Sequence, residues 1–180
     1  LRPNPSLVEQ VASPPYYVLD RQQAQTPAQD NPHSFLHIIK PEIDLKTNDP
    51  EQIYRQGRKA LQQFRKQYIL LEEDSPCLYM YRQIMGEHEQ TGFVGCVSVQ
   101  EYKDQVIKKH EYTRPSKVQD RVQLMRACRA QTGPVFLSYR QTEELALLKD
   151  KLLDKCEKVN DFTSYNQVRH QFFKIGEPFI

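Results

Sequence analysis

Tryptophan is absent from this 180-residue sequence, and apolar residues in general are scarce. Hydrophobic residues make up 38% of the chain and the mean hydropathy is -0.73. Soluble domains usually contain about 45–50% apolar residues. No apolar run is long enough to cross a bilayer or to form the core of a signal peptide. The composition excludes a helical membrane protein and predicts a lean core that further polypeptide or a partner chain completes.

Cysteine is also sparse, and its spacing does not match a metal-binding pattern. Cys77, Cys96, Cys128 and Cys156 form no CxxC pair, and each lies in an apolar stretch. A secreted protein would use four cysteines for two disulfides. Because no export signal is present, we interpret them as buried free thiols of a cytoplasmic protein.

An excess of either charge is missing as well, since 25 basic residues stand against 23 acidic residues. Proteins that bind nucleic acid generally carry a clear basic excess on one face. The overall charge therefore argues against nucleic acid as the partner, although it leaves a local basic patch open.

The apolar pattern and the turn signals predict helices that alternate with strands. Asp49 and Pro50 begin the clearest helix, and Asp20 is expected to cap a short polar helix. The expected longer helices cover residues 50–68, 115–132 and 143–158, and the expected strands cover residues 16–19, 34–40, 77–85, 91–99, 135–139, 162–165 and 168–175.

A polar, glycine-containing linker joins the strands at 77–85 and 91–99, which predicts a β-hairpin. The hairpin interrupts the alternation of helix and strand. We therefore expect an α+β or mixed α/β fold, with a mixed sheet, a β-hairpin and flanking helices. Residues 1–180 are expected to form a single α/β region, with residues 1–32 as a partly irregular lead-in.

Reactive side chains are concentrated at residues 108–121, which read KKHEYTRPSKVQDR. We expect this motif to join a strand that ends near Ile107 to a helix that starts near Pro115. The start of a helix offers unpaired N–H groups and positive potential, which favour phosphate or carboxylate groups. The candidate anion-binding residues around this helix start are Lys108, Lys109, Arg114 and Lys117.

The motif also contains a candidate general base. Glu111 and Thr113 share one side of an extended chain, whereas His110 points to the other side. A carboxylate beside an anion-binding helix start can deprotonate a hydroxyl nucleophile. The competing interpretation is a solvated junction in which Thr113 only caps the helix.

The predicted helix after the motif presents two faces. Lys117, Asp120 and Arg121 lie at helical spacing and are expected to share one polar face that extends the site. In the competing interpretation, Lys117 and Asp120 form a surface pair worth well under about 1 kcal/mol. The predicted buried face consists of Val118, Val122, Met125 and Cys128.

The remaining patterns predict no other site. His33, His37 and His88 lack metal-ligand spacing, so no metal ligands are assigned. Neither GxGxxG nor GxxxxGK followed by Ser or Thr occurs. Tyr79 and Tyr81 could stack on bases, but a β-hairpin contains such residues without any ligand.

Several separate motifs resemble, in their order along nearly the whole chain, the domain of unknown function 1015 family. They are PPY at 14–16, NPHSFLH at 31–37, PEID at 41–44, YMYRQ at 79–83, QTG at 90–92, the motif at 108–121 and QTGPVFL at 131–137. Tyr17 departs from the pattern, because the family usually has aspartate there.

The resemblance implies that this chain is a fragment, the N-terminal part of a protein about twice as long. Downstream, such proteins carry an Asp-Gly-His-His-Arg motif similar to the ligand-binding box of ParB-like domains and free serine kinases. It further implies a phosphotransferase that acts on serine or phosphoserine in serine metabolism, with ADP or ATP and Mg2+ bound in the full-length protein. No cofactor site is evident in this chain, which alone is expected to be nearly inactive.

The resemblance also implies residue roles and partners. Glu111 would orient or deprotonate the serine hydroxyl, and His110, Lys117 and Arg121 would bind phosphate charge. The expected partners are a small phosphorylated or hydroxy amino acid and the remainder of the same polypeptide, without a membrane. The alternative is a non-enzymatic ParB-like regulator that binds a nucleotide or nucleic acid through a basic surface with exposed aromatic residues.

Overall fold

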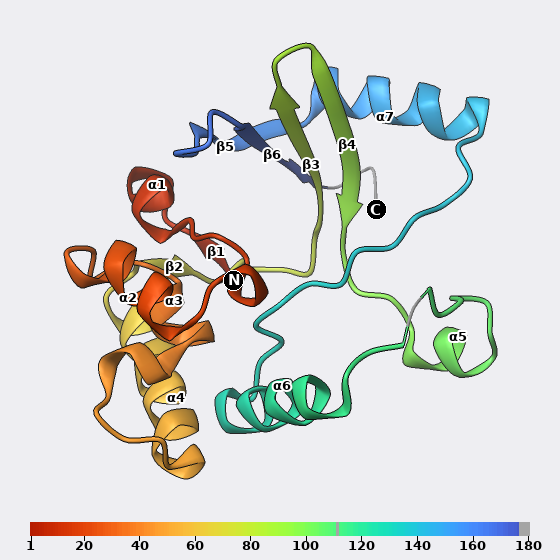
Figure 1. Ribbon diagram of the computed structural model, residues 1–180. Helices are drawn as coiled ribbons and strands as arrows, with labels where there is room; N and C mark the ends of the chain where they lie inside the picture. The colour runs from red at the N-terminus through yellow and green to blue at the C-terminus, as the bar shows by residue number, and fades with distance from the viewer. Residues whose placement is uncertain (111, 177–180) are drawn as a thin grey trace. The chain divides into compact units, whose positions relative to one another are not determined.

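The computed structural model describes residues 1–110 and 112–176 and divides the chain into two compact units (Figure 1). Unit 1 comprises Leu1–Glu72 and Lys108–Val135, and unit 2 comprises Glu73–Ile107 and the described part of Phe136–Ile180. Across the described residues there are seven α-helices and two antiparallel sheets, so the fold is α+β, as predicted. None of these helices is both long and apolar enough to span a bilayer.

Unit 1 is mainly helical and contains one very small sheet. Its elements are β1 (Arg2–Pro3) paired with β2 (Leu70–Leu71), α1 (Val8–Val11), α2 (Arg21–Gln29), α3 (Leu36–Ile39), α4 (Pro50–Lys66), α6 (Pro115–Cys128) and 3-10 helices at Pro5–Leu7, Tyr16–Val18 and Pro41–Asp44. The predicted cap of α2 is confirmed, because the Asp20 carboxylate accepts the Gln23 N–H and Gln23 bonds back to the Asp20 N–H.

Helix α4 supplies the central packing surface of unit 1. It begins as predicted, with the Asp49 side chain accepting the Glu51 N–H and Pro50 in the first turn. Its buried face packs into a core with α2, α3 and the chain around β2. The helix ends at Lys66, two residues before the expected end, and Tyr68 is exposed in a left-handed conformation with φ 56°.

Two strands predicted in unit 1 are wrong. Residues 16–19 begin with a 3-10 turn in which the Val18 N–H donates to the Pro15 carbonyl. Residues 34–40 contain α3, whose first turn is supported by the Ser34 hydroxyl accepting the Leu36 N–H. Here the local hydrogen bonds favour helical turns, and a short apolar run buried on several sides has no period that separates strand from helix.

Unit 2 is a four-stranded antiparallel sheet covered on one face by a helix (Figure 1). Its elements are β3 (Leu78–Met85), β4 (His88–Val94), α5 (Val99–Lys103), α7 (Glu143–Lys155), β5 (Glu157–Thr163) and β6 (Arg169–Ile175), with strand order β4-β3-β6-β5. Leu152 of α7 packs on Met80, Phe173 and Ile175 of the sheet. The predicted β3–β4 hairpin is confirmed, although its turn is tighter, with Gly86 at φ 60° directly before Glu87. The pairing of β5 with β6 was not predicted: β5 begins at Glu157, whereas the helix was expected to continue to residue 158 and the strand to cover residues 162–165.

Two further predicted strands are absent from the described structure. Residues 106–107 form bends rather than a strand, and residues 135–139 have irregular backbone. The second segment leaves Val135 and Phe136 exposed. Both segments have β-prone sequences, but a strand is stabilised only by pairing with a neighbour.

Helix α6 packs on α4 at a close approach that only glycine allows. A methyl group on Gly57 would lie 2.8 Å from Leu124 Cδ1, 3.0 Å from the Ile38 carbonyl oxygen and 3.2 Å from Pro41 Cγ. Leu124 is completely buried, whereas Val118, predicted to be buried, is 44% exposed. The buried face of α6 is therefore centred on Leu124 rather than on Val118 and Val122.

We expect Gly57→Ala to lower the free energy of unfolding by about 1–3 kcal/mol, because the added methyl group overpacks the contact between α4 and α6. In an unobstructed helix the same change would be stabilising by about 1 kcal/mol. Urea denaturation checks this, with Gln62→Ala at an exposed position of the same helix as the control. A stabilised Gly57→Ala variant would contradict the close approach.

Candidate functional site

The candidate site lies at the start of α6 and in the chain that leads to it. Lys108, Lys109 and His110 are exposed and lie in irregular chain rather than at the end of a strand. The predicted catalytic residue Glu111 lies outside the described residues. The strand-to-helix junction is therefore a loop-to-helix junction, although the helix begins at Pro115, as predicted.

The four cations predicted to bind an anion are accessible at this junction. We call Lys108, Lys109, Arg114 and Lys117 the cationic cluster; all four are exposed. Lys109 Nζ lies 5.1 Å from the centre of the Tyr112 ring. Within the part of the chain that the structure describes, no acidic side chain forms an ion pair with any member.

The backbone at the start of α6 adds positive potential to the cationic cluster. Arg114 is the N-cap residue and makes no side-chain capping hydrogen bond, and the first turn contains no acidic residue. Thr113 is exposed and is not the N-cap, which rules out the simple capping role considered for it. Pro115 has no N–H and the Lys117 N–H donates to the Arg114 carbonyl oxygen at 3.0 Å, so this helix start would favour an anion mainly through the positive potential of its dipole.

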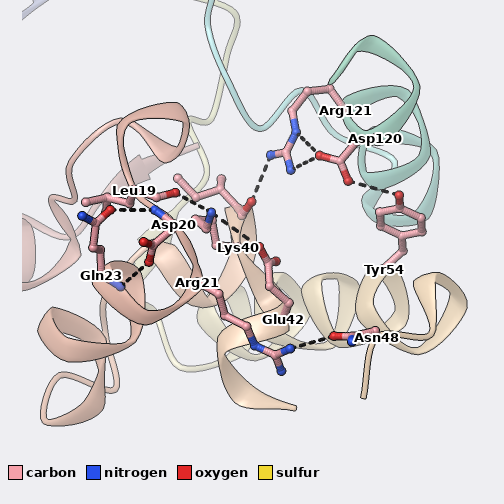
Figure 2. Close-up of polar contacts among 11 residues, drawn as sticks. Leu19, Asp20, Arg21, Gln23, Lys40, Glu42, Asn48, Tyr54, Asp120 and Arg121 are labelled. Carbon is pink, nitrogen blue, oxygen red and sulfur yellow. Dashed lines mark hydrogen bonds and ion pairs between the residues drawn. The ribbon is translucent and has the colours of Figure 1, made fainter. Parts of the chain in front are cut away.

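Asp120 and Arg121 are directed into unit 1 and bind each other (Figure 2). Arg121 Nη2 donates to Asp120 Oδ2 at 2.6 Å, and Arg121 Nη1 donates to the Ile39 carbonyl oxygen at 2.9 Å. The Tyr54 hydroxyl of α4 donates to Asp120 Oδ1 at 3.1 Å. The Arg121 guanidinium also lies 4.2 Å from the centre of the Tyr16 ring. We call Tyr16, Ile39, Tyr54, Asp120 and Arg121 the α6 anchor.

The electrostatics of the α6 anchor are consistent with a structural ion pair. Burial, and then the neighbouring Asp120 carboxylate, raise the pKa of Tyr54, so its hydroxyl remains a proton donor. The Arg121 side chain is 21% exposed and the Asp120 side chain 40% exposed. A planar guanidinium that bridges a carboxylate, a carbonyl and an aromatic ring fixes a helix more firmly than an exposed pair does.

The predicted site residues thus separate into two groups. All of the first group are exposed: Lys108, Lys109 and His110 lie in the irregular chain before α6, Thr113 and Arg114 lie directly before its first turn, and Lys117 lies in that turn. Asp120 and Arg121 belong to the α6 anchor, and Asp120 pairs with Arg121 rather than with Lys117. Their direct contact with a substrate stays a prediction.

A second polar cluster, which the sequence patterns did not suggest, lies in unit 2. The Tyr81 hydroxyl is 2.6 Å from His170 Nδ1, and the Ser164 hydroxyl is 2.7 Å from His170 Nε2. Tyr81 also stacks on Phe172 at 4.4 Å between ring centres. The contact between Tyr81 and His170 spans 89 sequence positions, so only the pairing of β3 with β6 reveals it.

The heavy-atom contacts of this cluster favour a proton arrangement that does not activate Ser164. Burial lowers the pKa of His170 and raises the pKa of Tyr81 to about 12. Tyr81 therefore keeps its proton and His170 is neutral. Because the Ser164 hydroxyl already has two acceptors, the tautomer that fits is the one in which Nε2 carries the proton and Nδ1 accepts from the Tyr81 hydroxyl. Nε2–H then donates to Ser164, whose hydroxyl donates to Asn166 Oδ1 or the Val168 carbonyl. A base for Ser164 would need an unprotonated Nε2.

Unit 1 also contains a half-buried histidine that contacts a carboxylate. His37 Nδ1 lies 2.8 Å from Asp44 Oδ1, and His37 Nε2 lies 3.0 Å from the Asn31 carbonyl oxygen. The hydrogen bond to Asp44 raises the pKa of His37 and outweighs the opposing effect of burial. The residues described here contain no group of three or more His, Cys, Asp or Glu side chains that could hold a metal ion.

We expect Arg121→Lys to lower the free energy of unfolding by about 1–3 kcal/mol, because one ammonium group cannot replace the guanidinium contacts to Asp120, Ile39 and Tyr16. Arg126→Lys, at an exposed position of the same helix, is the control and should be nearly neutral. Equal stability of the two variants in urea denaturation would show that the α6 anchor does not hold the helix.

Comparison with known proteins identifies a family. The family described as "Protein of unknown function (DUF1015)" matches residues 1–179. Neither a curated protein nor a solved structure is significantly similar to the chain. The implied likeness to ParB-like domains and serine kinases remains a prediction. Because the match covers nearly the whole sequence, the chain belongs to the DUF1015 family, as its ordered motifs predicted.

Proposed function

We propose that this chain provides the phosphate-binding part of a cytosolic phosphotransferase that acts on serine or phosphoserine. The observation that carries the proposal is the cationic cluster. Its four side chains are exposed along residues 108–117, in and directly before a helix start without a side-chain cap, and they have no acidic partner among residues 1–110 and 112–176. Such a combination favours a doubly charged phosphate over a neutral ligand.

The α6 anchor supports the proposal because phosphoryl transfer depends on positioning. The barrier to this reaction is lowered mainly by fixed charges and by the alignment of the phosphate with its acceptor. Arg121 and Asp120 attach α6 to α4 and to the carbonyl of Ile39. The first turn of α6, four residues earlier, therefore keeps a constant orientation in unit 1.

The remaining parts of the proposed reaction come from neighbouring residues and from further polypeptide. Glu111 would act as the general base for the serine hydroxyl, and His110, which is exposed beside it, would bind phosphate charge. ADP or ATP with Mg2+ would be held mainly by residues outside this chain. The four cysteines are free thiols, but the prediction that they are buried is wrong, because Cys96 is exposed and the other three are half-buried.

One observation favours a second candidate, a non-enzymatic regulator that binds a nucleotide or nucleic acid. Tyr112 is 96% exposed and lies next to the amino group of Lys109. A basic segment with an exposed aromatic ring is typical of surfaces on which bases stack. An enzyme must distinguish serine from its analogues, whereas such a regulator must bind the base of a nucleotide.

The phosphate-binding role predicts that phosphoserine binds to the chain and serine does not. Lys117→Gln should weaken phosphoserine binding about five- to tenfold, because one charge-assisted contact to phosphate is lost. Lys59→Gln removes the same charge from an exposed position on α4 and should leave the affinity unchanged. Isothermal titration at two salt concentrations measures both variants. If both substitutions weaken phosphoserine binding equally, the loss of affinity comes from the lower net charge and not from a specific contact of Lys117.

The catalytic role predicts phosphoryl exchange by the intact protein that contains this chain. Incubation with serine and ATP, or with phosphoserine and ADP, in the presence of Mg2+ should yield the exchanged products. Glu111→Gln should slow exchange at least about 100-fold, because the general base is lost. Glu87→Gln in the exposed β3–β4 turn is the control. Unchanged exchange in Glu111→Gln would exclude the catalytic assignment, and absence of exchange would favour the regulator.

A further inference from the structure

Two cysteines, Cys77 and Cys96, lie just beyond the paired residues at the open end of the β3–β4 hairpin. The antiparallel register runs from Met85 opposite His88 to Tyr79 opposite Val94. Continued by two positions, the same register places Cys77 opposite Cys96. Directly opposed residues in an antiparallel pair point their side chains to the same face of the sheet.

The two chain segments are still side by side at the intervening position. A methyl group on Gly95 would lie 2.5 Å from Leu78 Cδ2, so the Leu78 side chain covers Gly95 directly. Only glycine leaves room for this contact. The strands have therefore not diverged one residue before the two cysteines, even though the regular ladder ends at Val94.

The distance expected from this register permits a disulfide. Opposed residues in an antiparallel pair have Cα atoms about 4.5 or 5.5 Å apart, depending on their hydrogen bonding. Disulfides span Cα distances of about 4.4–6.8 Å. Both thiols are free in this structure.

The surroundings of the two thiols differ in a way that suits a stepwise reaction. Cys96 is exposed, whereas Cys77 is half-buried. Burial, and then the neighbouring Cys77 and Glu73 side chains, raise the pKa of the Tyr79 hydroxyl, which donates to Glu73 at 2.7 Å. An oxidant therefore reaches Cys96 first, and Cys77 is the neighbouring thiol that resolves the adduct.

The other two cysteines are poorly suited to compete. Cys128 and Cys156 are both half-buried, and burial raises the pKa of each thiol. A raised pKa lowers the fraction of reactive thiolate at neutral pH. Cys128 lies in α6 and Cys156 lies directly after α7. In the sheets of the described residues, neither of them is paired with another cysteine.

We propose that Cys77 and Cys96 form a reversible disulfide by exchange with a low-molecular-weight disulfide such as glutathione disulfide. The Cys96 thiolate attacks one sulfur of the reagent, forms a mixed disulfide and releases one glutathione thiolate. The Cys77 thiolate then attacks the Cys96 sulfur and releases the second. The protons of the two protein thiols pass to the two glutathione molecules, which leave reduced, and the protein loses two hydrogen atoms.

The disulfide would fix the point where the chain leaves the sheet. Residues 95–98 connect β4 to α5. Val97 in this connection and Val99 at the start of α5 are both exposed. Closing the bond ties the end of β4 to the chain that enters β3 and encloses the whole hairpin in a covalent loop. Such a bond stabilises the folded state chiefly by restricting the unfolded chain.

Equilibration of the full chain in glutathione buffers of increasing oxidised fraction tests the proposal. After acid quenching, free thiols are alkylated and peptides are mapped by mass spectrometry. We expect a Cys77–Cys96 peptide, with Cys128 and Cys156 alkylated, that reappears as two thiols when reduced glutathione is restored. Cys77→Ser should stop at a glutathione adduct on Cys96, Cys96→Ser should form neither species, and Cys128→Ser should behave like the wild type.

Thermal unfolding provides a second readout that does not depend on peptide recovery. The oxidised wild type should melt at a higher temperature than the reduced protein, and Cys77→Ser should lose this difference. Two results would overturn the proposal. One is a wild type that accumulates the Cys96–glutathione adduct as the Cys77→Ser variant does, and the other is a disulfide from Cys96 to Cys128 or Cys156.

Discussion

The packing of α6 on α4 is the contact on which the candidate site depends. Gly57 lets the two helices approach closely enough for Leu124 to be completely buried, and one turn away Asp120 accepts the Tyr54 hydroxyl. The first contact is apolar and places the helices together, whereas the second is polar and directional and fixes the rotation of α6. Because side chains on a helix share a rigid backbone, this rotation also determines where Lys117 points. The exposed start of α6 is therefore a consequence of how its middle is buried.

Local signals in the sequence predicted the elements that local interactions specify. Asp49 with Pro50 marked the start of α4, and Asp20 marked the start of α2, because capping involves residues within one turn of each other. For residues 34–40 and 135–139 such local signals were missing, and the strands predicted there are wrong. The first has apolar residues buried on several sides, so its period is ambiguous, and the second is β-prone but has no neighbouring strand in the described structure. Strand identity is decided by a partner that the segment itself does not encode.

The sequence predicted where along the chain the candidate site lies, but it did not predict which residues contact one another there. The concentration of cations before Pro115 identified the junction, and the structure confirms the helix start there. Helical spacing predicted that Asp120 and Arg121 share a polar face with Lys117, but their partners Tyr54 and Ile39 lie 66 and 82 positions away. The polar cluster around His170 was missed for the same reason. In each case the decisive neighbour is distant in sequence and is brought close only by the tertiary fold.

The division of the charged motif explains how a basic site can exist in a protein of balanced charge. Asp120 is the acidic residue nearest to Lys117 along α6, and it would partly neutralise the cationic cluster if it pointed to the same side. Instead it accepts hydrogen bonds from Arg121 and Tyr54, so its negative charge is compensated within unit 1. The cations at the start of the helix then keep their positive potential toward solvent. An ion pair that contributes modestly to stability thus has a second effect, which is to keep the charge of the candidate phosphate site unneutralised.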